Sequence, residues 1–506
     1  MINMNFQKAY WGWLKSKDNL EVELMKAFTQ AIITIDGYVW GTPLIVAILG
    51  VGLLLTIRLG FLQFRRLGKA LKYMTHNEVG GEGEVSSFAA LTTALAATVG
   101  TGNIVGVATA IVAGGPGALF WMEIAALFGM ATKYAEGLLA VKYRVMDDNG
   151  HAIGGPFYYI ENGLGKKWIP LAKAFALFAA IAAAFGPGTI TQVNSITQAI
   201  NNVFDPKASN IAFSIGENQY TWTTAICAVV ITTLVALILI GGIQRIASVA
   251  SFLVPSMMVI YVVTVTAMII YNINAVPAAF VTIFKSAFGI KAVGGGALGA
   301  MMAAMQKGVA RGIFSNESGL GSAPIAAAAA QTREPARQGL VSMTGTFLDT
   351  IVICTMTGLS IVLTGSYNVG LDGADVTIRA FGKALPWSQQ FGAVVLMTCL
   401  TIFAFTTILG WNYYGERSME YLTGGNQKSV MIYRYVYILA VFFAPFLTLE
   451  FIWTAADIFN ALMAIPNLIA LIALNGVVVS TTKDYFKRLD AGLIDEGPAF
   501  KKKKKA

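Results

Sequence analysis

One glycine-rich segment combines residue types that can hold an ion or a small polar molecule within an apolar environment. Gly100-Thr-Gly-Asn103 lies near the middle of an apolar stretch over residues 86–113. Glycine costs about 1 kcal/mol relative to alanine in a helix interior, and unwound backbone at membrane depth must line a cavity or pack against protein. We therefore expect a helix break, whose carbonyls suit Na⁺ and whose amides suit a carboxylate. A packing stripe is the alternative, although packing alone does not require the polar Asn103.

A second candidate for cation binding lies in the apolar stretch 387–413. Thr406 and Thr407 carry adjacent hydroxyls, which can join backbone carbonyls as hard oxygen ligands. Trp411 lies four residues after Thr407 and shares its helix face. Threonine in such a helix usually bonds back to the preceding turn, so this pair is weak evidence by itself.

Further glycines and amides suggest contacts to a solute. Gly294-Gly-Gly296, followed by Gly299, opens a later apolar stretch and is a candidate counterpart of the first break, although it could also be the outer end of that helix. Gln192 follows Phe185-Gly-Pro-Gly188 and is a plausible solute contact. The basic, glycine-rich segment 307–324 is expected to be a cytoplasmic loop. It lacks the GxxxxGK[ST] pattern of a phosphate-binding loop.

Several ionisable residues lie inside apolar stretches, where each is a functional candidate by default. Asp349, near the middle of the stretch 338–365, could relay protons or bind a cation. It could equally pair with a basic residue and hold two helices in register, which we favour because several cations are available. The full set is Glu123, Lys133, Glu136, Lys173, Asp349, Arg434 and Asp457.

The composition indicates an integral membrane protein and argues against an enzyme. Hydrophobic residues make up 56% of the 506 residues and charged residues 12%, about half the usual share of charged residues in a soluble domain. The three cysteines have no metal-binding or disulfide spacing, and the two histidines, His76 and His151, lie in loops. We expect no catalytic residue, no cofactor and no nucleic-acid partner.

The elements that must position these residues are membrane helices of about 20 apolar residues each. Eleven are expected: 38–57, 86–113, 117–141, 168–203, 220–240, 247–272, 294–314, 338–365, 387–413, 430–448 and 450–479. Setting aside the first leaves ten, which divide into two halves of five with opposite orientation, an arrangement found in many secondary transporters. The fold class is therefore an all-α polytopic membrane protein with a 5+5 inverted repeat and one extra N-terminal helix.

The expected parts of the chain follow from this division: an amphipathic extracytoplasmic segment over 1–37, a peripheral helix over 38–57, five-helix repeats over 86–273 and 274–480, and a basic tail over 481–506. Lysine and arginine gather in the loops that would be cytoplasmic if the N-terminus lies outside and the C-terminus inside. The terminal run Lys501–Lys505 could contact anionic lipid, although a solvated tail is the simpler interpretation.

Long motifs make the chain similar to the alanine or glycine:cation symporter family, which includes sodium:alanine symporters. The similarity covers roughly residues 35–480. It rests on Gly100-Thr-Gly-Asn-Ile-Val-Gly106, Gly114-Gly-Pro-Gly117, Gly154-Gly-Pro156, Gly308-Val-Ala-Arg-Gly-Ile-Phe-Ser-Asn-Glu-Ser-Gly-Leu-Gly-Ser-Ala-Pro324 and Gly410-Trp-Asn-Tyr-Tyr-Gly-Glu416.

The resemblance implies a LeuT-type fold and Na⁺-coupled symport of alanine or glycine by alternating access, in a bacterial inner membrane among lipids. It implies a sodium site made by the carbonyls of Ala96, Val99 and Phe403 and the hydroxyls of Thr406 and Thr407. The solute carboxylate would meet the amides around Gly100 and Gly102, together with Asn103. The rest of the solute would be surrounded by Thr98, Gln192, Gly295, Gly296, Gly299 and Trp411.

The alternatives are a symporter that uses H⁺ or prefers glutamine, and a passive channel or sensor. Stereochemical preference, ion stoichiometry and oligomeric state are left open by the sequence.

Overall fold

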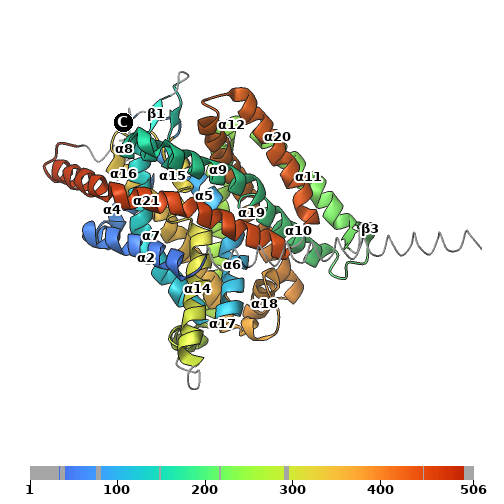
Figure 1. Cartoon of the computed structure of the whole chain (residues 1–506). Coiled ribbons are helices and arrows are strands. Elements are labelled where there is room, and N and C mark those ends of the chain that lie inside the picture. The colour runs from blue at the N-terminus through green and yellow to red at the C-terminus, as the bar shows by residue number, and fades with distance from the viewer. Residues whose placement is uncertain are drawn as a thin grey trace, which may run out of the picture.

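The computed structural model describes residues 34, 40–75, 81, 83–146, 150–215, 218–289, 296–447 and 449–494. The described part is built almost entirely of helices (Figure 1). Its first half contains α2 (Thr42–Arg58), α3 (Leu62–Arg65), α4 (Leu67–Thr75), α5 (Ser87–Thr98), η1 (Thr101–Asn103), α6 (Val105–Gly114), α7 (Gly117–Lys142), α8 (Pro156–Leu164), η2 (Lys166–Trp168), α9 (Ile169–Phe185), α10 (Ile190–Phe204), α11 (Trp222–Leu239) and α12 (Gly242–Tyr271).

The second half contains η3 (Ile273–Ala275), α13 (Val276–Ala287), α14 (Gly296–Asn316), α15 (Ala323–Ala327), α16 (Pro335–Thr346), the π-helix η4 (Phe347–Cys354), α17 (Thr355–Leu363), η5 (Ser366–Asn368), α18 (Ala374–Ala384), α19 (Gln389–Leu422), α20 (Gln427–Phe443), η6 (Ala444–Phe446) and α21 (Leu449–Asp490). Two short antiparallel hairpins connect helices. They are β1 (Val145–Met146) with β2 (Ala152–Ile153), and β3 (Ile211–Ile215) with β4 (Asn218–Thr221).

Eight helical segments of the described residues are long and apolar enough to cross a membrane. The shorter apolar helices α2, α5 and α6 and the segment Ile273–Ala287 accompany them. The predicted polytopic helical membrane fold is confirmed, while the count of eleven spans stays a prediction. The proposed N-terminal segment lies outside the described residues except for Thr34, as does the run Lys501–Lys505.

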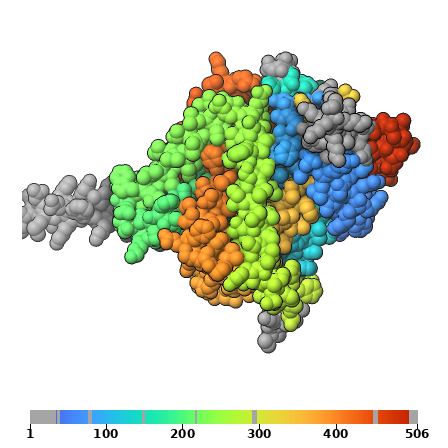
Figure 2. Space-filling view, turned by 180° about the vertical axis from the view of Figure 1, so that it is seen from behind, coloured from blue at the N-terminus to red at the C-terminus, as the bar shows by residue number. Residues whose placement is uncertain are grey.

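Burial separates an inner group of helices from an outer layer. α7 is mostly buried and packs against α14 and α16 at the centre of the molecule. α12 forms a long column on the face seen in Figure 2, where Phe252 and Val263 are 73% and 63% exposed. Large apolar side chains exposed along a whole helix are expected to face lipid.

Several predicted segments differ from the observed ones. The expected span 168–203 is two helices, α9 and α10, because Gly186-Pro-Gly188 interrupts it. Helix α13 was not expected, and α21 runs as helix to Asp490, past the expected boundary at residue 480.

The segment 307–324 is not a surface loop, while its cytoplasmic side stays a prediction. Helix α14 includes this segment up to Asn316, and residues 312–330 are buried. The charge of Arg311 is offset by Asp457, with which it forms a bidentate ion pair at 2.8 and 2.9 Å.

Candidate cation and solute site

The first helix break forms where the glycines predict it. α5 begins at the N-cap Ser86, whose Oγ accepts from the Ala89 amide, and it ends at Thr98. The chain then passes through η1 before α6 begins at Val105. Gly100 adopts an irregular backbone conformation, with φ −142° and ψ −146°. The backbone groups of this turn are therefore released from regular helical bonding.

Two amides of the break are bound by oxygen atoms of the protein itself. The Gly100 amide donates to Asn103 Oδ1 at 2.9 Å, and the Thr101 amide donates to Gln192 Oε1 at 3.1 Å. Gln192 is held in place because its Nε2 donates to the Pro187 carbonyl at 2.9 Å. The N-terminal end of the second half-helix thus presents donors to carbonyl oxygens, as a carboxylate-binding turn would.

The threonines of α19 lie directly beside the end of α5. Thr406 Oγ1 and Thr407 Oγ1 donate to the Phe403 carbonyl at 2.9 and 3.0 Å. The Thr407 hydroxyl also lies 3.4 Å from the Val99 carbonyl, which brings oxygens of the two helices together. Ala96 is fully buried in the last turn of α5, next to Ala97, whose backbone packs against Gly410.

Both hydroxyls thus bond back to the preceding turn, as the weaker interpretation of a threonine pair allowed. The carbonyls of Val99 and Phe403 both point to the Thr407 hydroxyl. The combination of hydroxyl and carbonyl oxygens in a buried, neutral setting fits a hard monovalent cation.

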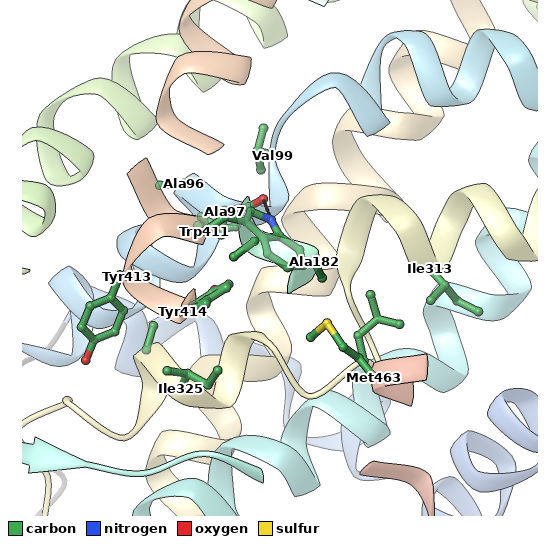
Figure 3. Close-up of a cluster of buried hydrophobic side chains, with 14 of the residues drawn as sticks. Ala96, Ala97, Val99, Ala182, Ile313, Ile325, Trp411, Tyr413, Tyr414 and Met463 are labelled. Carbon is green, nitrogen blue, oxygen red and sulfur yellow. Dashed lines mark hydrogen bonds between the residues drawn. The ribbon is translucent and has the colours of Figure 1, made fainter. Parts of the chain in front are cut away.

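Trp411 closes the site between three helices. Its indole Nε1 donates to the Ala97 carbonyl at 3.3 Å (Figure 3). Its ring lies so close to Gly188 that a Cβ at that position would overlap it. The break between α9 and α10 therefore leaves room for this indole. It also places Gln192 against the first break.

Asn103 connects the first break to the second half of the chain. Its Nδ2 donates to Asp349 Oδ1 at 2.8 Å and to the Asp349 carbonyl at 3.0 Å. Ser315 Oγ and Thr350 Oγ1 both donate to Asp349 Oδ2, at 2.9 and 2.7 Å. The expected basic partner of Asp349 is thus replaced by neutral donors, although the carboxylate does tie helices together.

A second buried break lies at residues 317–322, between α14 and α15. Glu317, Gly319 and Gly321 have φ of 57°, 88° and 81°, and the whole segment is buried. The last turn of α14, directly before this segment, packs close to the first break, since a Cβ on Gly102 would lie 2.9 Å from Ser315 Cα. Glycine is required at 319 and 321 because other residues rarely adopt this conformation.

Glu136 of α7 organises the second break. Its Oε1 accepts from the amides of Gly319 and Gly321 at 3.1 and 3.2 Å, and from Asn467 Nδ2 at 2.7 Å. Lys133, one turn earlier, donates to the Asn316 carbonyl at 2.8 Å. These two buried side chains satisfy the released amides and carbonyl of the break, which apolar core residues could not do.

Gly296 and Gly299 are not brought together with the other predicted residues. Both are exposed in the first turn of α14, whose other end meets the site, and Gly299 has no atom near its missing Cβ. Gly295 lies outside the described residues. The signal for the break at 317–322 was the run Asn316-Glu-Ser-Gly-Leu-Gly321, whose polar residues pointed to a loop but not to its depth.

Thr98 lies at the edge of a narrow cavity below the first break. Its Oγ1 bonds back to the Ala94 carbonyl at 3.1 Å. The cavity has about 10 Å³ of space between α5, α7, α15 and α16 and also contacts Lys133 and Gln338, which is about the room that one water needs.

Main-chain bonds hold the segment before α5 against the residues that follow α15. The amides of Glu84 and Val85 donate to the Ala329 carbonyl, and the Gln331 amide donates to the Val85 carbonyl. Arg144 further binds the carbonyls of Ala328, Ala330 and Thr332 at 3.0, 2.7 and 3.0 Å. The start of α5 is thereby bound to the segment that follows α15.

Comparisons with known proteins place relatives beside this chain. The model of the sodium:alanine symporter family matches residues 25–502. An uncharacterised transporter of Haemophilus influenzae is 56% identical and covers 92% of this chain and 98% of its own length. The sodium/alanine symporter AgcS of Methanococcus maripaludis is 46% identical, over 90% of this chain and 97% of its own. The probable sodium/glutamine symporter GlnT of Bacillus subtilis is 37% identical, over 90% of both chains.

Among solved structures, MhsT in complex with L-phenylalanine has the same fold. The TM-score is 0.55 at 12% identity, and the match covers 80% of this chain and 93% of that one. The expected LeuT-type fold is therefore confirmed, although this low identity speaks for the fold alone.

Proposed function

We propose, from the premise that this chain belongs to the sodium:alanine symporter family, that it imports alanine or glycine together with Na⁺. The observation that carries the proposal is the meeting of Thr407 Oγ1 with the carbonyls of Val99 and Phe403, across α5 and α19. A cation here would join two helices that belong to different halves of the inverted repeat. The membrane would be a bacterial inner membrane, with the N-terminus outside.

Na⁺ is proposed to bind the carbonyls of Ala96, Val99 and Phe403 and the hydroxyls of Thr406 and Thr407. Ion binding would turn both hydroxyls, so that they give up the Phe403 carbonyl and direct lone pairs to the ion. All five ligands are neutral, so the bound ion keeps its charge and can attract the carboxylate of the solute at the adjacent break.

The solute is proposed to bind between the two breaks. Its carboxylate would replace Asn103 Oδ1 and Gln192 Oε1 on the amides of Gly100 and Thr101, and Gly102 lets the last turn of α14 approach. The carbonyls released at residues 317–322 would accept from the ammonium group of the solute. Thr98 and Trp411 would limit the space for its side chain. The close packing of Gly188 on Trp411 favours a small solute.

Because the ion and the solute would share the first break, each must raise the affinity for the other by the same factor. Release to the inside would require the bonds between residues 84–85 and 329–331 to part. The inward Na⁺ gradient would then drive net uptake by alternating access.

The test is uptake of labelled alanine by proteoliposomes with an inward Na⁺ gradient. We expect accumulation above the outside concentration, which collapses when Na⁺ is equal on both sides. Equilibration without accumulation would indicate a channel instead. Accumulation driven by a proton gradient alone, or glutamine competing far better than alanine or glycine, would favour the alternative symporters.

Replacing Gln192 with glutamate is expected to weaken solute binding more than tenfold. The new carboxylate would occupy the Thr101 amide as a permanent rival of the solute carboxylate, with a charge-assisted bond about twice as strong as the present one. Alanine-dependent stabilisation of the purified protein against heat measures the effect.

Gln198→Glu is the matched control, since Gln198 lies on the same helix and lines an outer pocket away from the break. If Gln192→Glu binds alanine as the unmodified protein does, the Thr101 amide is no part of the solute site.

A further inference from the structure

A separate cavity lies between the turn after α2 and the end of α21. It has about 420 Å³ of space, far more than the cavity at the helix break. Figures 1 and 2 both show the last turns of α21 beside the segment α2–α4. This cavity shares no lining residue with the proposed cation and solute site.

The lining of this cavity is strongly basic. Arg58, Arg65, Arg66, Lys483 and Lys487 line it together with one acidic residue, Asp490. The five basic groups and one carboxylate leave about four positive charges around one pocket. Such a concentration of like charge is costly unless an anion offsets it.

The local backbone holds this arrangement open. Gly60 and Phe61, in the turn after α2, have φ of 65° and 57°. Arg65 Nη1 donates to the Gly60 carbonyl at 3.0 Å, and the Arg66 guanidinium stacks on the Phe486 ring at 4.5 Å. The charges are thus positioned by the chain itself, on two elements far apart in the sequence.

The cavity also has the surroundings of a membrane interface. Arg58 ends the apolar helix α2, and Ile57, Phe61 and Phe64 beside it are 58%, 50% and 56% exposed. Leu59, Leu62, Val479 and Phe486 add apolar walls to the basic lining. A ligand that satisfies both features carries an anionic head and an apolar tail.

We propose that this basic pocket binds the headgroup of an anionic phospholipid from the adjacent membrane leaflet. The phosphate would lie among the arginines and lysines, and the acyl chains would run along the exposed side chains of α2. Basic pockets between membrane helices are suited to such headgroups. The lipid would link α2 to α21, which packs on α8 and α9 near the second break.

Lipid binding to the purified full-length protein tests this directly, without a transport measurement. Dioleoylphosphatidylglycerol is titrated into the protein in neutral detergent, and the bound lipid is counted by native mass spectrometry. We expect tighter binding than for dioleoylphosphatidylcholine. Lys483→Gln with Lys487→Gln should weaken the phosphatidylglycerol binding about thirtyfold, from the loss of two charges near a lipid phosphate.

Lys166→Gln with Lys167→Gln is the matched control, because both lysines are exposed at η2, outside the pocket. It should keep the preference, as should deletion of Lys501–Lys505. The proposal is overturned if the control variant or the tail deletion loses the preference for phosphatidylglycerol as fully as the Lys483 and Lys487 variant. It is also overturned if the Lys483 and Lys487 variant keeps that preference. Displacement of the lipid by glycerol 1-phosphate or inorganic phosphate would also overturn it, in favour of a free phosphate site. Arg58→Gln provides a second variant should the lysine pair fail to fold.

Discussion

The double variant Thr406→Ala with Thr407→Ala is expected to need a far higher Na⁺ concentration to drive transport. The substitution removes the two hydroxyls among five proposed ligands and leaves the carbonyls of Val99 and Phe403 without their donor. Each contact to a charged group contributes about 1.5–3 kcal/mol to the free energy of binding. The apparent Na⁺ affinity should therefore fall more than a hundredfold, measured from the Na⁺ dependence of alanine uptake in proteoliposomes.

Two controls separate this effect from damage to α19. Thr406→Ser with Thr407→Ser keeps both hydroxyls and should keep most of the Na⁺ affinity. Thr398→Ala removes an exposed hydroxyl of the same helix, which bonds back to the Val394 carbonyl, and should change nothing. Na⁺-driven uptake unchanged in the double alanine variant would refute the assignment of the cation site.

The second large effect is expected for Glu136→Ala. This change leaves three buried donors, the amides of Gly319 and Gly321 and the Asn467 side chain, without their shared acceptor. Each unsatisfied group costs about 1–3 kcal/mol. We expect a lower unfolding temperature and more than a hundredfold loss of alanine uptake, because the second break would no longer hold its conformation.

Glu136→Gln distinguishes positioning from simple stabilisation. It keeps one acceptor oxygen of the same reach but loses the charge, so it should fold and retain part of the transport with a raised KM for alanine. The Na⁺ affinity, which depends on α5 and α19, should change less than the alanine KM. If the Gln variant lowers the unfolding temperature but leaves the alanine KM unchanged, Glu136 stabilises the fold alone.

The membrane fold and the first break could be predicted from local sequence. Apolar stretches about as long as the bilayer is thick have few alternatives to helices, and paired glycines next to Asn103 are costly in a continuous helix. The pairing of this break with Thr406, Thr407 and Trp411 came from the family resemblance. The structure brings these residues together.

The second break needed tertiary information. Its residues, from Glu317 to Ser322, are polar and glycine-rich and follow two basic residues, which is the local pattern of a surface loop. Only the folded chain supplies Glu136 and Lys133 from α7, Asn467 from α21 and Asp457 for Arg311. A buried polar segment is stable only when such partners exist, and no local rule reveals partners more than a hundred residues away.

The sequence by itself thus determined that this protein is a bundle of membrane helices with a polar break in the helix over 86–113. The tertiary structure decided which polar segment lies beside the first break. Gly296 and Gly299 are exposed, whereas the turn around Gly319 and Gly321 is buried, and we propose this turn as the second half of the site. The physical reason is that the residues that favour a helix break, such as glycine and asparagine, lie in the local sequence. The groups that satisfy the released backbone belong to other helices.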